Sequence, residues 1–154
     1  MQYKNAEKYV EALLFAAKDV KRGVSCARQQ ANKKRREFLG IAARGSNVPD
    51  PTAKAAINNV SPLPVVRCSN GNGSFVVVAP EKWLRAIKQA FDLYGSRFGS
   101  EALETIRHRY VDGWNVRQIK EVQGISKSLY QQRRTEFLHC LLLYAVQAGI
   151  IEIE

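Results

Sequence analysis

The feature that most constrains this fold is the stretch of residues 113–126, in which helix stops, helix caps and apolar positions follow one another at short intervals. Glycine favours the end of a helix, and Asn or Ser favours the start of the next one. These signals fall at Gly113, Asn115, Gly124 and Ser126. They predict a short helix over residues 116–123, a tight turn with Ile125 as an apolar plug, and a long helix that starts after Ser126.

Two further helical patterns frame this stretch. A helix over about residues 101–112 is expected before it, with Ser100 as its cap. The inward residues predicted for this helix and for the short one are Ala102, Leu103, Ile106, Tyr110, Val116, Ile119 and Val122. After Thr135 the last helix becomes apolar, so it is expected to pack on the helix around Trp83, on the N-terminal segment or on another subunit. The whole pattern predicts a helix-turn-helix at about residues 101–148.

The first turns of the last helix carry polar side chains that suit base edges and phosphates. The base-reading candidates are Lys127, Ser128, Gln131, Gln132 and Arg134. The candidates for contacts to the DNA backbone are Arg107, Arg109, Arg117, Lys120, Ser126 and Arg133. From Arg107 to Arg134 there are seven basic and two acidic residues, a local charge of +5. This sorting of charge favours a helix that enters the major groove of double-stranded DNA.

The N-terminal segment, residues 1–44, is basic and amphipathic. It has eleven basic and four acidic residues, and apolar or small residues recur at spacings of three and four from Val10 to Ala31. The pattern predicts a long helix, or two helices broken at Gly23, with a partner helix from this chain or from a second copy in a homodimer or higher oligomer. A secondary basic patch comprises Lys33, Lys34, Arg35 and Arg36. It fits a contact with phosphate backbone or RNA, and equally a solvated helix face.

The middle segment, residues 45–79, reads as a linker. A short helix is expected over residues 50–57, followed by two short strands, residues 65–68 and 75–78, around a Gly- and Asn-rich turn. Pro80 is expected to open a helix to about Tyr94, and residues 80–154 form the DNA-binding domain. The predicted fold class is therefore mainly all-α, with a long N-terminal helix, a C-terminal helix-turn-helix domain and a small β-hairpin.

Composition narrows the function classes. The chain has 24 basic and 14 acidic residues, a net charge of +10, which favours a polyanionic partner such as nucleic acid or an anionic membrane surface. The longest apolar patch is too short to span a bilayer and no signal peptide is visible, so we expect a cytoplasmic protein without a membrane partner. Three isolated cysteines and two isolated histidines predict no metal site. We also expect no enzyme activity, no cofactor and no small-molecule substrate.

Residues 110–119, Gly124-Ile125-Ser126 and the helix up to Arg134 resemble the helix-turn-helix of region four of bacterial sigma factors. Together with Asp50-Pro51-Thr52-Ala53 and the helix around Trp83, the chain resembles the RinA and ArpU group of phage transcription activators. The resemblance implies activation of late phage genes in the bacterial host, together with RNA polymerase. It also implies base reading by Lys127, Ser128, Gln131 and Gln132. Lys120 departs from the pattern, in which a small residue is usual.

Two other functions fit the same pattern. A small terminase subunit or another DNA-packaging protein also combines a helix-turn-helix with an oligomerising helix, although its helix-turn-helix usually comes early in the chain. A module that binds RNA polymerase without affinity for DNA would use the same three helices as a protein interface.

Overall fold

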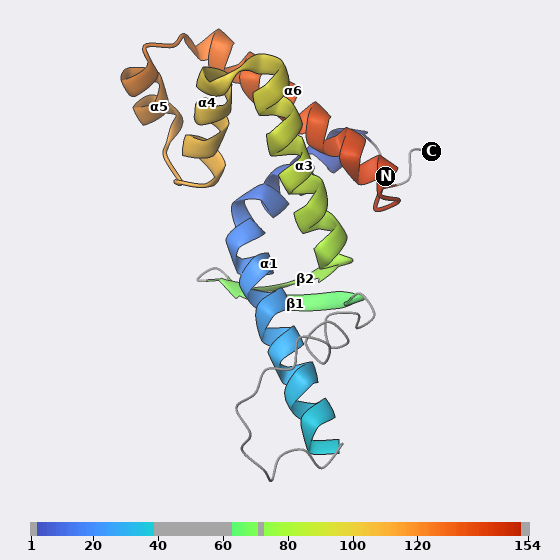
Figure 1. The fold of residues 1–154 in the computed structure, drawn as a ribbon. Helices are drawn as coiled ribbons and strands as arrows, with labels where there is room; N and C mark the ends of the chain where they lie inside the picture. Colours follow the sequence, from blue (N-terminus) through green and yellow to red (C-terminus); the bar gives the residue numbers. More distant parts are fainter. Residues whose placement is uncertain (1–2, 39–62, 71–72, 152–154) are drawn as a thin grey trace. The chain divides into compact units, whose positions relative to one another are not determined.

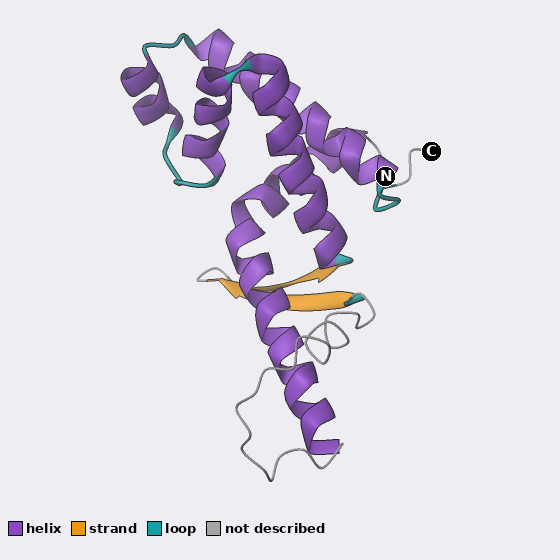
Figure 2. Ribbon diagram, viewed as in Figure 1, coloured by secondary structure: helices purple, strands orange, loops and turns teal. Residues whose placement is uncertain are grey.

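The computed structural model describes residues 3–38, 63–70 and 73–151. These residues are mainly helical with one small antiparallel hairpin (Figures 1 and 2), which confirms the predicted fold class. In chain order the elements are α1 (Tyr3–Phe38), β1 (Val65–Asn70), β2 (Gly73–Val78), α3 (Pro80–Phe98), α4 (Ser100–Tyr110), α5 (Val116–Gln123) and α6 (Lys127–Gln147). The predicted short helix over residues 50–57 lies outside the described residues. None of the described helices has both the length and the apolar character that a membrane span requires.

The chain divides into two compact units. One comprises Met1–Lys18 and Lys82–Glu154, and the other comprises Asp19–Glu81. Both divisions fall inside helices, α1 and α3, whereas the sequence pattern places its segment boundaries near residues 44 and 79. The first unit therefore contains the start of α1 together with α4, α5 and α6, and the second contains the rest of α1 with the hairpin.

In the second unit, the hairpin packs against α1 at Gly23. The helix runs through Gly23 without a break, which decides between the one-helix and two-helix predictions. A Cβ atom at this position would lie 2.7 Å from Cγ1 of Val66 and 3.2 Å from Sγ of Cys68. The glycine therefore lets β1 approach the helix closely, and this packing offsets its low helix propensity.

The hairpin has one buried and one exposed face. Val66 pairs with Val77, and both side chains are buried together with Cys68. The pair Val65 and Val78, one position away, is exposed on the opposite face, as the alternation of strand side chains requires. The predicted strands are confirmed, and each is longer by two residues on the side of the turn.

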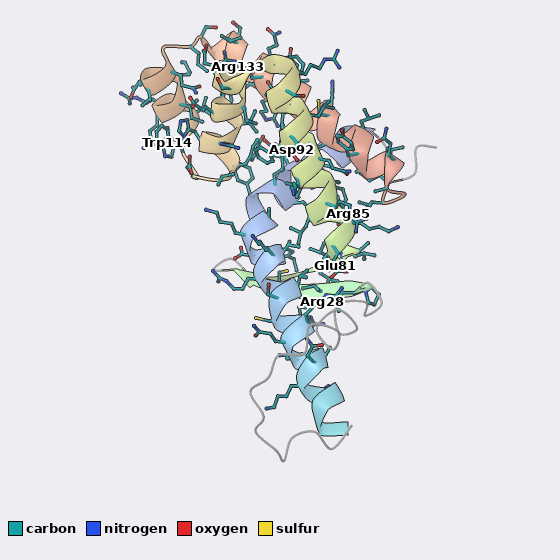
Figure 3. All side chains as sticks on the ribbon, viewed as in Figure 1. Arg28, Glu81, Arg85, Asp92, Trp114 and Arg133 are labelled. Carbon is teal, nitrogen blue, oxygen red and sulfur yellow. The ribbon has the colours of Figure 1, made fainter. Side chains whose placement is uncertain are left out.

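An ion pair links α1 to the start of α3 within the second unit. The Arg28 guanidinium on α1 binds the Glu81 carboxylate at the start of α3, with Nε 2.8 Å from Oε1 (Figure 3). The backbone N–H of Leu63 donates to the other oxygen of Glu81 at 3.3 Å. The carboxylate thus joins α1 to the residues before β1.

The core of the first unit is built around Phe137 of α6, which is fully buried. Its ring centroid lies 4.8 Å from that of Phe91 and 5.5 Å from that of Tyr94, both on α3. The Tyr110 ring of α4 lies 6.2 Å away. Leu138, Leu141 and Leu142 extend this buried face, whereas Leu143 is exposed. The apolar half of α6 therefore packs within its own chain, on α3 and α4.

Three local predictions are wrong. Helix α3 continues past Tyr94 to Phe98, because Gly95 is a close-packing position where a Cβ atom would lie 2.8 Å from Cδ2 of Leu103. The turn to α4 occurs at Gly99, with φ 88°, so Ser100 is the first residue of α4 and its side chain is not the cap. Val122 is 66% exposed, because Gln123 takes the inward position on α5.

Gly23→Ala is expected to destabilise the protein even though alanine is the better helix former. The helix gains roughly 1 kcal/mol of propensity. The methyl group overlaps the buried, β-branched Val66, and overpacking costs about 1–3 kcal/mol. Urea unfolding followed by circular dichroism should show a lower free energy of unfolding. In a Val66→Ala background, Gly23→Ala should cost much less than it does in wild type, and the exposed Ser25→Ala is the control. A Gly23→Ala protein more stable than wild type would contradict the packing role.

Candidate nucleic-acid interface

Side-chain caps start both helices of the helix-turn-helix, and a glycine ends the first of them. Asn115 Oδ1 accepts a hydrogen bond from the Gln118 backbone N–H at 2.9 Å, and Gln118 Oε1 accepts one from the Asn115 backbone N–H at 3.0 Å. Gly124 adopts the left-handed conformation, with φ 64°. Ser126 Oγ then accepts from the Leu129 N–H at 3.1 Å. Cap, glycine and cap are confirmed at the predicted positions.

A small apolar cluster fixes α5 against the start of α6. It consists of the buried residues Ile119, Ile125 and Tyr130, with Trp114, Val116 and Leu129 packed around them. Ile125 is the predicted plug, and it fills the space between the two helices. The first two turns of α6 therefore have a defined orientation relative to α5.

The connection between α4 and α5 is also ordered by side chains. The indole ring of Trp114 stacks on the imidazole ring of His108, with centroids 4.0 Å apart (Trp114 is labelled in Figure 3). Arg109 Nη1 donates to the Trp114 carbonyl oxygen at 3.1 Å, and its guanidinium lies over the Phe15 ring. Arg109, a predicted backbone contact, is therefore occupied within the protein.

A buried polar network joins α4, α5 and α6. The Thr105 hydroxyl on α4 is fully buried and donates to Gln123 Oε1 on α5 at 2.7 Å. The Thr105 hydroxyl oxygen also accepts a hydrogen bond from Arg133 Nη1 on α6 at 2.8 Å, and Arg133 Nη2 lies 3.0 Å from Glu101 Oε1. The Arg133 side chain is only 12% exposed, so this predicted backbone contact links helices instead (Figure 3). Sequence analysis missed Thr105 and Gln123, since neither belongs to a local capping or turn pattern.

Arg134 is occupied by a second contact, to the N-terminal part of α1. Its Nε donates to Glu11 Oε1 at 2.8 Å, and the Tyr110 hydroxyl donates to the same oxygen at 2.8 Å. The Arg134 guanidinium holds the pKa of the Glu11 carboxyl below its ordinary value, and burial raises the pKa of the Tyr110 phenol. Arg134 was predicted to read bases, but the structure places it in a three-residue link between helices.

Four of the five base-reading candidates remain exposed on α6: Lys127, Ser128, Gln131 and Gln132. Thr135, which sequence analysis did not select, is exposed one turn further on. Ser128 Oγ lies 3.0 Å from Ser126 Oγ, and Gln132 Nε2 donates to Glu136 at 2.8 Å. Lys127 and Gln131 have no hydrogen bond or ion pair to another described side chain. The exposed start of α6 therefore presents a cation, a hydroxyl and two amides.

Cations also flank this surface on α4 and α5. Arg107 is exposed and Lys120 is half-buried. Arg117 pairs with Glu121 at 2.8 Å, but the two side chains are 86% and 60% exposed, so water competes for the pair. These three remain available for phosphates, in contrast to Arg109 and Arg133. In the secondary basic patch, Lys33 and Lys34 are exposed and belong to the other unit, and the side chains of Arg35 and Arg36 lie outside the described residues.

Within the ranges that the structure describes, no three His, Cys, Asp or Glu side chains come together as a metal site. No protein-family model, curated protein or solved structure matches this chain. The chemistry of the surface is therefore inferred from its own residues.

Thr105→Val is expected to loosen the joint between α4, α5 and α6. Valine keeps the shape of threonine but leaves the Arg133 guanidinium and the Gln123 amide without their shared partner. A lost buried hydrogen bond of this kind costs about 1–3 kcal/mol. Urea unfolding measures the loss, with Thr135→Val on the exposed face of α6 as the matched control. Equal stability of the two variants would show that the network carries no energy.

Glu11→Gln is expected to lower stability at neutral pH but not in acid. The folded-state pKa of Glu11 lies below its ordinary value of 4.5, so its contribution is present above that value and is lost as the pH falls through the folded-state pKa. We expect a loss of about 1–3 kcal/mol at pH 7. Unfolding of wild type and variant at a series of pH values measures it, with the exposed Glu104→Gln as control. A difference that is the same at all pH values would contradict the charge-based explanation.

Proposed function

We propose that this chain binds double-stranded DNA through the first two turns of α6, which enter the major groove. The observation that carries the proposal is the set of exposed side chains Lys127, Ser128, Gln131 and Gln132 on a helix start that caps, plug and core hold in one orientation. Amide side chains bond two adjacent groups of adenine, and lysine bonds to guanine. The apolar second half of α6 anchors this helix in the protein core.

Phosphate contacts come from a smaller set of residues than the charge suggests. Because Arg109, Arg133 and Arg134 are bound within the protein, we assign the backbone contacts to Arg107, Arg117 and Lys120. The unpaired backbone N–H groups at the start of α6, after Ser126, add a site for one phosphate oxygen. Arg107→Gln should weaken binding to all sequences and lower the slope of log affinity against log salt by about one.

We further propose that DNA binding serves transcription, as an activator of late phage genes acting in the bacterial cytoplasm with host RNA polymerase. The support is the sigma-like order of helix, turn and helix from Tyr110 to Arg134. A single helix-turn-helix makes a small interface, so a second copy or polymerase is expected to contribute affinity. The exposed Val122 on α5 is an apolar side chain available for such a protein contact.

The packaging alternative predicts a ring-like oligomer and binding at packaging sequences. The interaction module predicts polymerase binding that survives without DNA affinity. The leading proposal predicts selective binding to a promoter sequence, and neither alternative does. A measurement of sequence selectivity therefore distinguishes it from both.

Selection of bound duplexes from a random pool tests the proposal. One enriched motif is expected, and Gln131→Ala should relax its base preference by about 1–3 kcal/mol. Gln89→Ala, an exposed glutamine on α3, is the matched control and should leave the preference unchanged. Equal, weak binding to all duplexes would contradict base recognition by α6. Unchanged selectivity of Gln131→Ala would show that Gln131 does not contact bases.

A further inference from the structure

The part of α1 in the second unit has an unusual charge pattern. Seven basic residues and no acidic residue lie between Asp19 and Glu37. Exposed surface helices of soluble proteins commonly alternate charges so that acids and bases pair one turn apart. Here Asp19 lies three residues before Arg22, and Glu37 follows Lys33 and Lys34 at spacings of four and three, whereas the other four bases have no acid at such a spacing. The bases of this segment therefore outnumber the acids that could pair with them, which favours a partner outside the helix.

One face of this segment is covered and the other is free. The hairpin packs against Gly23, and Glu81 binds Arg28. The free face carries exposed polar residues over four turns: Lys21, Arg22, Ser25, Cys26, Gln29, Gln30, Lys33 and Lys34. We call these eight residues the α1 basic face. None of its four cations forms an ion pair with another described residue.

The helix dipole explains only part of this pattern. Cations are favourable in the last turn of a helix, which fits the placement of basic residues near Phe38. Lys21 and Arg22 lie in the middle of the 36-residue helix, where the dipole effect has decayed. Asp19 lies three residues before Arg22, but neither cation forms an ion pair with a described residue, and both are exposed. These unpaired cations favour a bound polyanion.

We propose that the α1 basic face is a second, sequence-independent binding site for the phosphate backbone of a DNA duplex. The two pairs of cations lie about 18 Å apart along the helix, which spans about five base pairs of duplex. Ser25, Gln29 and Gln30 between them donate hydrogen bonds to phosphate oxygens without reading bases. The choice of DNA as the polyanion rests on the proposed function of α6.

An anionic membrane fits this face poorly. A helix that lies in a bilayer interface buries large apolar side chains beside its cations. No large apolar side chain is exposed among residues 21–34. Charge complementarity without an apolar stripe is the signature of phosphate-backbone binding.

Cys26 provides a direct test, because its exposed thiol lies in the middle of the α1 basic face. Burial raises the pKa of the Cys68 and Cys140 thiols, so both react more slowly with iodoacetamide. Alkylation of Cys26 in the full chain is measured by mass spectrometry with and without duplexes of random sequence, at low and high salt. Duplex at tenfold its dissociation constant should slow the reaction about tenfold, and high salt should reverse the effect.

Matched variants separate this site from the one on α6. Lys33→Gln with Lys34→Gln should abolish most of the protection, whereas Arg85→Gln with Lys88→Gln on α3 should retain it. Lys127→Gln with Gln131→Ala should lose base preference but keep Cys26 protected, so failure of either site is seen independently. Bound DNA that leaves Cys26 fully reactive would overturn the proposal. Protection only by RNA duplexes, anionic vesicles or an acidic protein would also overturn it.

Discussion

The adjacent arginines in the middle of α6 are the contacts on which the rest of this surface depends. Neighbouring residues on a helix point about 100° apart, so Arg133 reaches Thr105 while Arg134 reaches Glu11. Both guanidinium groups are partly removed from water, with Arg133 12% and Arg134 28% exposed, and each has a carboxylate partner that offsets this loss of hydration. The two contacts therefore fix both the rotation of α6 and its position against α4 and α1. Ahead of them the helix has an exposed polar face beside the buried Tyr130, and behind them its buried face is apolar from Phe137 to Ala145.

These internal contacts reduce the number of cations in residues 107–134 that are available to a partner. The segment from Arg107 to Arg134 carries a net charge of +5, but three of its cations serve packing and loop geometry. For the proposed DNA interface, a smaller set of free cations implies fewer phosphate contacts and gives the exposed amide and hydroxyl groups a larger part in the proposed base reading. The interpretation of a basic segment therefore depends on which cations already have partners in the folded chain.

Local signals predicted the helices and the turn, because caps and glycines act within about four residues. Asn115, Gly124 and Ser126 belong to this class. The position of Arg134 depends on Glu11, 123 residues away in the sequence, and no spacing rule reports such a contact. The helix predicted to end at about Tyr94 continues through Gly95, which packs closely against Leu103. In both cases, the contact joins two different helices, and local sequence signals do not report such contacts.

The parts of helix α1 before and after Asp19 differ in charge and in the contacts of their charged side chains. Three of its four acidic residues, Glu7, Glu11 and Asp19, lie in the first half, where Glu11 neutralises Arg134 and Glu7 lies 3.3 Å from His139. Beyond Asp19 the helix has seven basic residues and one acid, Glu37, and among the described ion pairs Arg28 alone has a carboxylate partner there, Glu81 at the start of α3. Most carboxylates of α1 thus lie in the part that binds cations of its own chain, and the later part has a large excess of cations. This excess of free cations is the charge distribution on which the proposed polyanion site of α1 rests.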